Sequence, residues 1–333
     1  MNILHQLPKY LFFTFFAFLV CACSDTFTDS PYPPIEFVEK TVMPGTGRSS
    51  AVAFVINNKG YVALGRDASS TTLNDCWEYD PTLESWTLKA PFPGSARVKA
   101  MAAVVNNRAY VGLGFSTGGE IYNEEAYPKD FWMFDPISNS WTRKADFPSI
   151  ASDACVSFVY NNFIYVGGGF ADFGFAKEFW KYDTEKDLWI HLTNFPGEPR
   201  SGSVICSNGE RVFFGTGYRT LNENDWWEYF PKSDEWKKRK SMPDDGRENG
   251  VSLCINKRMF VSTGRHFGGN MTGGHVKSDI IEYNLDRNEW YKRGNIPEGK
   301  RENAISFTIK GKGYIGFGEN DTNVLNDFWC FEP

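Results

Sequence analysis

Arginines recur in this sequence at a fixed distance from aromatic residues, and their chemistry suits an anionic ligand. Each lies eleven residues after a tryptophan or phenylalanine; the five are Arg48, Arg97, Arg200, Arg247 and Arg301. A planar guanidinium group can bind a carboxylate or sulfate through paired hydrogen bonds. We therefore predict a ring of ligand-binding arginines, joined by Asp153 from the copy in which Ser152 replaces the arginine. In the alternative hypothesis the arginines pair with backbone or acidic groups of the fold, since Glu248 and Glu302 directly follow two of them.

The other residue types that could do chemistry form no familiar catalytic or metal-binding motif. The four histidines, His5, His191, His266 and His275, are too dispersed for a three-histidine zinc site, and no CxxC pair occurs. The sequence also lacks a phosphate-binding glycine loop, a nucleophile elbow and an HExxH segment. It therefore predicts no metal and no cofactor.

Composition excludes two broad classes of protein. The formal net charge is −6, so the chain lacks the excess of positive charge that a general nucleic-acid binder needs to neutralise phosphates. Aromatic residues make up 17% of the chain, far more than a disordered protein carries. The chain must therefore fold around a large aromatic core, and we expect no nucleic-acid partner.

The arginine spacing is part of a longer repeat. Five tryptophans, Trp86, Trp141, Trp189, Trp236 and Trp290, are each preceded at eleven residues by an acidic residue and followed at seven residues by a proline. Beyond each arginine or Ser152, an aromatic residue follows at thirteen residues and a glycine at seventeen. Each unit contains four short β-type runs, which in the first unit are residues 50–56, 60–64, 76–79 and 85–89. A unit of about 50 residues with four strands is typical of a propeller blade.

These residues resemble the kelch family of β-propellers over residues 36–333. The resemblance implies an all-β, six-bladed β-propeller of four-stranded kelch blades. The sixth unit ends before its fourth strand, but Phe37, Pro44 and Arg48 reproduce the end of the repeat at the start of the chain. We therefore predict that an N-terminal strand closes the last blade, which leaves no free sheet edge between the first and last blades.

All of the length variation between units falls in the connection between the second and third strands. The two longest connections are residues 115–129 in the second blade and 265–278 in the fifth, which lie opposite each other in a ring of six. They share a face with the arginines, and loops on a rigid scaffold commonly carry binding function. We predict a groove between them, lined by Tyr122, Glu124 and Tyr127 on one side and by Arg265, His266 and His275 on the other.

The start of the chain is predicted to be a targeting signal. Residues 10–22 are apolar without a break, too short for a spanning helix but typical of a signal peptide. Ala22-Cys23 then resembles the lipobox of bacterial lipoproteins. We expect a signal peptide at 1–22, lipidation at Cys23, a polar tether at 23–35 and attachment to the bacterial cell envelope by the lipid anchor alone.

Two functions remain open from the sequence. The leading hypothesis is a monomeric, non-catalytic module that binds a protein or glycan through the face of the variable loops. The alternative rests on a resemblance to the periplasmic sialate mutarotases, which are also six-bladed kelch proteins. It implies that Arg247 with Glu248, or Arg301 with Glu302, binds an acidic sugar and moves its anomeric proton.

Overall fold

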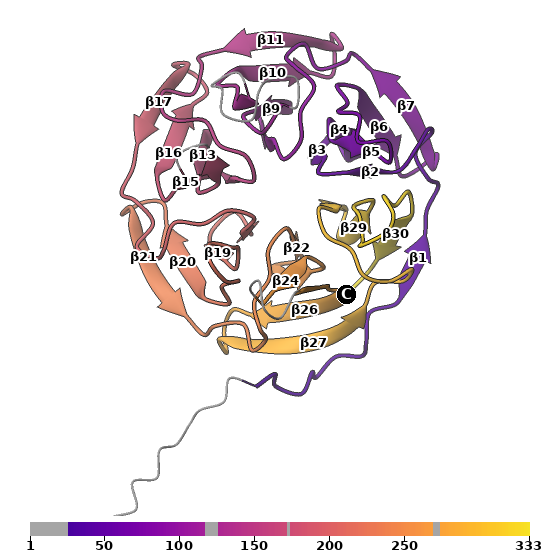
Figure 1. Cartoon of the computed structure of the whole chain (residues 1–333), viewed down its shortest axis with the longest axis vertical. Coiled ribbons are helices and arrows are strands. Elements are labelled where there is room, and N and C mark those ends of the chain that lie inside the picture. Colours follow the sequence, from indigo (N-terminus) through magenta and orange to yellow (C-terminus); the bar gives the residue numbers. More distant parts are fainter. Residues whose placement is uncertain (1–25, 117–125, 172–173, 269–273) are drawn as a thin grey trace, which may run out of the picture.

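The computed structural model describes residues 26–116, 126–171, 174–268 and 274–333, and these residues form a six-bladed β-propeller (Figure 1). The sheets are antiparallel and follow chain order within blades one to five. Blade one contains β3 (Val52–Ile56), β4 (Lys59–Ala63), β6 (Cys76–Asp80) and β7 (Ser85–Lys89). Blade two contains β8 (Met101–Val105), β9 (Arg108–Gly112), β10 (Phe131–Asp135) and β11 (Ser140–Lys144). Blade three contains β12 (Val156–Tyr160), β13 (Phe163–Gly167), β16 (Phe179–Asp183) and β17 (Leu188–His191).

The remaining blades repeat this order, and the last one is completed from the other end of the chain. Blade four contains β18 (Val204–Ser207), β19 (Val212–Gly215), β20 (Trp226–Phe230) and β21 (Glu235–Arg239). Blade five contains β22 (Val251–Ile255), β23 (Arg258–Ser262), β26 (Asp279–Asn284) and β27 (Glu289–Asn295). Blade six contains β28 (Ile305–Ile309), β29 (Lys312–Gly316), β30 (Phe328–Phe331) and the N-terminal β1 (Phe37–Glu39).

The predicted closure of the ring is confirmed. β1 pairs with β30 in antiparallel register, with Phe37 opposite Phe331 and Glu39 opposite Trp329. The rings of Phe37 and Phe331 are in contact, with 5.1 Å between their centroids. The strand that precedes the first blade therefore supplies the outermost strand of the sixth, and β30 is paired on both of its edges.

The burial patterns show why these runs become strands. The innermost strands alternate, as in β3 and β8, because one side faces the next blade and the other lines the central channel. The second strands are buried at nearly every position, since both of their faces are covered by neighbouring blades. Two-residue turns with φ near 50–60°, such as Asn57-Asn58 and Asn106-Asn107, join these two strands.

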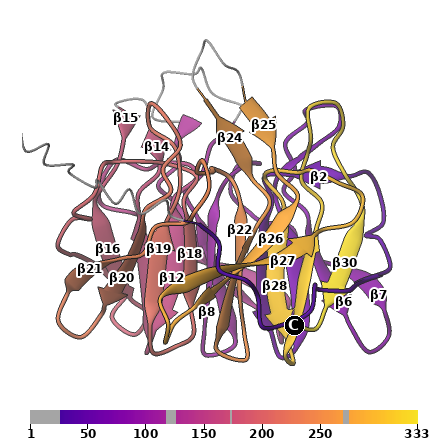
Figure 2. The same ribbon diagram turned by 90° about the horizontal axis from the view of Figure 1, so that it is seen from below.

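Three short ladders rise from one face of the disc, which we call the upper face (Figure 2). They pair β2 (Arg48–Ser49) with β5 (Arg66–Asp67), β14 (Phe170–Ala171) with β15 (Gly174–Phe175), and β24 (Arg265–Phe267) with β25 (Gly274–Val276). The upper face thus carries the connections between second and third strands, as the sequence predicts. Among the described residues there is no helix long and apolar enough to cross a membrane.

Residues 26–35, the described part of the predicted tether, lie along the outside of blade five. The Thr28 amide donates to the Trp290 carbonyl and the Ile35 amide to the Arg293 carbonyl. The Arg293 guanidinium in turn donates to the carbonyl of Pro33, at 2.9 and 3.3 Å. This segment therefore adds a further layer to the edge of β27 before the chain enters blade six.

Candidate functional site

The five repeated arginines are buried inside the blades, which corrects the prediction of a ligand-binding ring. No more than 3% of any of them is exposed. Each guanidinium group binds both oxygens of an aspartate at the start of the third strand of its own blade; the pairs are Arg48–Asp75, Arg97–Asp130, Arg200–Asp225, Arg247–Asp279 and Arg301–Asp327. These donors are therefore occupied by the protein itself. Arg247 and Arg301 are likewise unavailable as the catalytic groups that the enzyme hypothesis assigned to them.

A second hydrogen bond explains the constant spacing within the repeat. Each arginine Nη1 also donates to the carbonyl of the residue sixteen positions later, such as Leu64 for Arg48 and Leu113 for Arg97. That residue has a positive φ, 63° at Leu64 and 58° at Leu113, which turns its carbonyl toward the arginine. In blade three the Ser152 hydroxyl makes the same contact with the Gly168 carbonyl at 3.1 Å. The arginine, the aspartate and this carbonyl thus tie the first three strands of a blade together.

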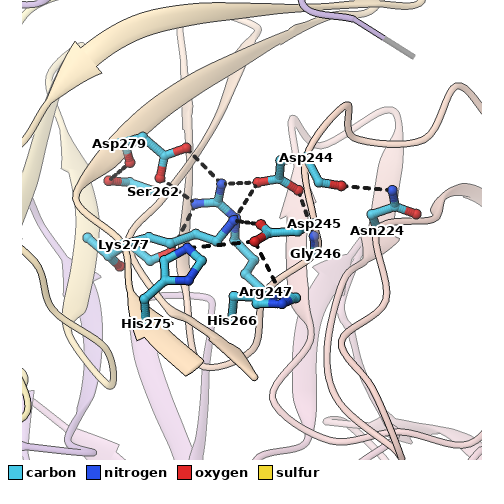
Figure 3. Close-up of polar contacts among 11 residues, drawn as sticks. Asn224, Asp244, Asp245, Gly246, Arg247, Ser262, His266, His275, Lys277 and Asp279 are labelled. Atoms are coloured by element: carbon cyan, nitrogen blue, oxygen red, sulfur yellow. Dashed lines mark hydrogen bonds and ion pairs between the residues drawn. The ribbon is translucent and has the colours of Figure 1, made fainter. Parts of the chain in front are cut away.

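Blade five extends this arrangement into a larger ionic cluster (Figure 3). Arg247 binds Asp244 as well as Asp279, and Lys277 binds both Asp244 and Asp245. Burial would raise the pKa of Asp244, but the charges of Arg247 and Lys277 outweigh it and lower the pKa to about 2. Asp244 is therefore ionised at neutral pH, and its ion pairs with Arg247 and Lys277 hold the base of the β24–β25 ladder.

The predicted ligand-binding residue His266 belongs to the outer part of this cluster. It lies opposite His275 in the ladder, with 5.3 Å between the ring centroids. His266 Nδ1 and His275 Nε2 each lie 3.6 Å from Asp245 Oδ2. The described residues contain no group of three or more His, Cys, Asp or Glu side chains that could hold a metal ion. The two histidines therefore share one carboxylate at the side of the upper face.

A closed belt of backbone hydrogen bonds surrounds the mouth of the central channel. One residue from the start of each innermost strand donates its N–H to its counterpart in the neighbouring blade, at 2.8–3.1 Å. The members, each with φ between 48° and 63°, are Ser50, Lys99, Ala154, Gly202, Asn249 and Asn303. The left-handed backbone conformation lets each peptide point along the ring. Because these hydrogen bonds hold the backbone, the residues next to the belt in sequence have fixed positions around the channel mouth.

Two sets of side chains surround this belt on the upper face. In each blade, the residue directly after the arginine or Ser152 forms a backbone bridge with a residue just beyond the end of the second strand. This second residue directly follows the glycine that lies seventeen positions after the arginine or Ser152. The pairs, in order from blade one, are Ser49–Arg66, Val98–Phe115, Asp153–Phe170, Ser201–Tyr218, Glu248–Arg265 and Glu302–Glu319. Aromatic residues therefore stand over blades two to four, whereas charged residues stand over blades five, six and one.

The aromatic residues over blades three and four belong to a series of ring contacts that ends at Phe267 in blade five. Phe170 contacts Phe175, Phe175 contacts Tyr218, and Tyr218 contacts Phe267, with centroid distances of 5.0, 6.0 and 5.8 Å. Phe170 remains 37% exposed. These rings form an aromatic wall on the upper face, beside the residues that flank the belt.

The charged half is largely satisfied within the protein. Arg265 binds Glu302 at 2.6 Å and Asp321 at 2.6 Å, and Arg66 binds both oxygens of Glu319 at 2.7 and 2.9 Å. Asn249 also donates to Glu302 at 3.1 Å. The predicted site residue Arg265 thus belongs to the mouth, but its donors already have partners.

Three charged groups at the mouth make no ion pair within the part of the chain that the structure describes. They are Lys99, which belongs to the belt, and Asp153 and Glu248, which lie beside it. Burial raises the pKa of Asp153, and the positive charge of Lys99 opposes this rise. Burial also raises the pKa of Glu248 to about 7; Lys99 opposes the rise, whereas the negative charge of Glu302 adds to it. A ligand at the mouth can therefore meet one ammonium and two carboxyl groups without breaking an ion pair among the described residues.

We expect the raised pKa of Glu248 to make stability fall as pH rises. The folded protein binds this proton up to about pH 7, whereas an unfolded glutamate releases it near pH 4.5. Stability should thus be fully present below pH ~4.5 and lost as pH rises through about 7, by up to about 3 kcal/mol. In urea titrations at several pH values, Glu248→Gln should remove most of this slope, whereas Glu210→Gln, at an exposed turn, should not. Parallel slopes in the wild-type and Glu248→Gln proteins would contradict the assignment.

Among the described residues, the structure brings none of the predicted groove residues of the second blade to the channel mouth. Tyr122 and Glu124 lie outside the described residues. Tyr127 is buried, with its ring 5.3 Å from that of Phe115.

Below the belt the channel continues as a cavity of about 230 Å³ lined by small residues such as Ala53, Ala102 and Ser157.

Sequence reasoning missed several members of the site, namely Lys99, Phe115, Phe170 and Tyr218. They occupy fixed places in the repeat, two residues after the arginine or one after the glycine. Comparing the blades at these positions would have shown that they differ in chemistry while their surroundings stay constant. This contrast is the signal of a varied surface on a repeated frame.

Comparison with known proteins supports the fold and no more. No protein-family model matches this sequence, and no curated protein matches it either. Many solved chains match the structure. One of them, described as the structure of YjhT, has a TM-score of 0.75 and 20% sequence identity, over 87% of this chain and 96% of that chain. The fold and its upper face define a six-bladed β-propeller with a two-sided, aromatic and charged channel mouth.

Proposed function

We propose that the protein is a kelch-type propeller that binds a glycan at the channel mouth of its upper face. The observation that carries the proposal is the pairing of an aromatic wall with three charged groups that lack ion-pair partners among the described residues. A pyranose ring has an apolar C–H face, which packs on an aromatic ring, and a rim of hydroxyl groups, which bind carboxylates and ammonium groups. Phe170 and Tyr218 supply the wall, and Lys99, Asp153 and Glu248 supply the polar partners.

The charges at the mouth favour a neutral glycan over a strongly anionic ligand. The unpaired set contains one cation and two carboxyl groups, and the arginines that could have bound an anion are buried in their own blades. Arg66 and Arg265 face the mouth but are already paired with Glu319 and Glu302. An acidic ligand would have to break those pairs before it gained new ones.

We expect Phe170→Ala to weaken glycan binding at least about fivefold, because a stacked ring contributes on the order of 1 kcal/mol. The side chain is 37% exposed, so its loss should leave the fold intact. Affinities for glycans selected on an array would be measured by calorimetry. The control Ile137→Ala removes a 90% exposed side chain in the turn between β10 and β11, on the opposite face, and should bind as the wild type does. A protein that captures only polypeptides, or binds glycans equally well after Phe170→Ala, would refute this function.

The pKa of Glu248 favours a second candidate, a sugar mutarotase. A carboxyl group whose pKa is about 7 can both donate and accept a proton at neutral pH, as ring opening and closure of a reducing sugar require. In this candidate Glu248 moves the proton, burial and then the negative charge of Glu302 raise its pKa, and neither Arg247 nor Arg301 takes part. NMR tests this candidate by following the interconversion of anomers in freshly dissolved N-acetylneuraminic acid and neutral sugars. A rate that the protein does not change would exclude mutarotase activity.

The proposal also places the protein at the bacterial envelope through a lipid on Cys23. The support is the sequence alone, namely the apolar run at 10–22 and the small residue before the cysteine. This location is tested by separating cells into membrane and soluble fractions and comparing the wild-type protein with Cys23→Ala. The wild type should be in the membrane fraction, and recovery of the variant there as well would contradict a lipid anchor.

A further inference from the structure

The outer strand of blade five, β27, is covered by the chain's own residues 26–35 (Figure 1). Two guanidinium groups lie over the ring of Tyr32, with 4.1 Å from Arg258 Cζ to the ring centroid and 5.2 Å from Arg293 Cζ. The next carbonyl, that of Pro33, accepts hydrogen bonds from Arg293. A proline flanks the tyrosine on either side. Blade five therefore shows that a strand edge with two arginines beside it holds an extended segment with an aromatic residue between prolines.

Blade four repeats the surface on which this tyrosine lies. In blade five Arg258 and Arg293 both bind Glu282. The same three positions of the repeat in blade four again hold two arginines and a glutamate, namely Arg211, Arg239 and Glu228. Arg211 binds both oxygens of Glu228 at 2.6 and 3.0 Å, as Arg258 binds those of Glu282 at 2.7 Å. This combination of residues occurs in no other blade.

The arginine pair of blade four is open to solvent. Its outer strand, β21, pairs only with β20 among the described strands. The side chains of Arg211 and Arg239 are 31% and 22% exposed, whereas that of Arg293, beside the N-terminal segment, is 2% exposed. Arg239 binds Glu228 through Nε and Nη2, so within the described residues its Nη1 group keeps an N–H for another carbonyl.

A cavity of about 600 Å³ lies along the same edge of blade four. Its lining includes residues 235–237 of β21. The corresponding positions of blade five are residues 289–291, where Thr28 forms a parallel β-bridge with Tyr291. Tyr291 is completely buried, whereas its counterpart Lys237 is exposed. Blade four is therefore hollow where the N-terminal segment covers blade five.

We propose that the outer edge of blade four binds an extended segment of a partner protein that carries an aromatic residue between prolines. The aromatic ring stacks on the guanidinium group of Arg211, as Tyr32 does on that of Arg258. The carbonyl that follows accepts from Arg239, and the backbone pairs with the open edge of β21. The prolines keep the segment extended before it binds, which lowers the entropy lost on binding.

The partner is a different protein and not a second copy of this chain. In each copy the segment 26–35 is joined directly to β1 and already occupies its own blade five. A segment attached in this way has an effective concentration on the order of millimolar at its own site, so it stays there. The edge of blade four is left for a segment supplied from outside.

The test adds a synthetic peptide of residues 26–36 to the full-length protein and follows binding by calorimetry. We expect saturable binding of one peptide per protein. A peptide with alanine in place of Tyr32 should bind at least about fivefold more weakly, because it lacks the stacked ring. A scrambled peptide of the same composition, which keeps the same charge, should not bind. These comparisons leave the protein unchanged, so they do not depend on the folding of a variant.

Two matched variants then place the peptide on blade four. Arg211→Lys keeps the charge but loses the planar group that stacks, and should weaken binding about two- to fivefold. Arg258→Lys makes the same change in blade five and should bind the peptide no more weakly than the wild type. Absence of saturable binding, or equal binding of the scrambled peptide, would overturn the proposal. Equal weakening by both variants would also overturn it, because the peptide would then be displacing the chain's own segment.

Discussion

Replacing Arg97 with alanine is expected to lower the free energy of unfolding by about 3–5 kcal/mol, since it leaves the carboxylate of Asp130 in a largely buried place without its cation. Arg97 is fully buried and donates to Asp130 at 2.6 and 3.0 Å, to the Leu113 carbonyl at 3.2 Å and to Ser95. Urea denaturation of the purified variant measures the loss. The variant removes one ionic tie in blade two and leaves the equivalent ties of the other blades in place.

Blade three supplies a natural control for this experiment. Ser152 stands where the arginine stands elsewhere and makes a single hydrogen bond, to the Gly168 carbonyl. Ser152→Ala should therefore cost only about 1 kcal/mol. Adding Asp130→Ala to Arg97→Ala should recover part of the lost stability, because the unpaired charge is removed. An Arg97→Ala protein that unfolds like the wild type but loses its ligand would restore the original prediction of a ligand-binding ring.

Removing residues 1–40 should lower the unfolding midpoint by at least about 5 °C and cause aggregation. The truncation deletes β1, which leaves β30 as an exposed edge and uncovers Phe331. It also removes Pro33, whose carbonyl accepts from the Arg293 guanidinium. A loss of several kcal/mol corresponds to a shift of this size in a chain of this length. Thermal unfolding and light scattering measure the two effects.

Two further chains show whether ring closure is the cause. Removing residues 1–25 alone keeps every N-terminal contact described above and should leave the midpoint unchanged. A permuted chain that begins at Thr46 and carries residues 35–45 after Pro333 should recover most of the stability. This permutation is feasible because the end of β30 already lies beside the start of β1, with Phe331 opposite Phe37. A truncated chain as stable as the full one would show that β1 does not close the ring.

The role of the repeated arginines shows where sequence reasoning stopped short. The acidic partner was visible in the repeat, since Asp75 and Asp130 stand eleven residues before their tryptophans. A further signal lay in blade three, where the arginine and the aspartate are both replaced, by Ser152 and Glu178. The two changes together indicate a pair within the blade. Spacing along the chain placed these residues on one face but did not give the direction of their side chains.

The sequence by itself determined the six blades, their strand order and the closure by β1. The alternation of buried and exposed residues and the residue types of turns are local properties of the sequence. Because the repeat contains them in every unit, they can be recognised without knowledge of the tertiary structure. Only the tertiary structure decided which polar groups face one another across blades. Arg97 and Asp130 are 33 residues apart, and Arg265 and Glu302 are 37 apart, so whether each finds its partner depends on how separate segments pack. The tertiary structure therefore buried the arginines that chemistry had singled out, and it left Lys99 and Asp153 at the channel mouth without ion-pair partners among the described residues.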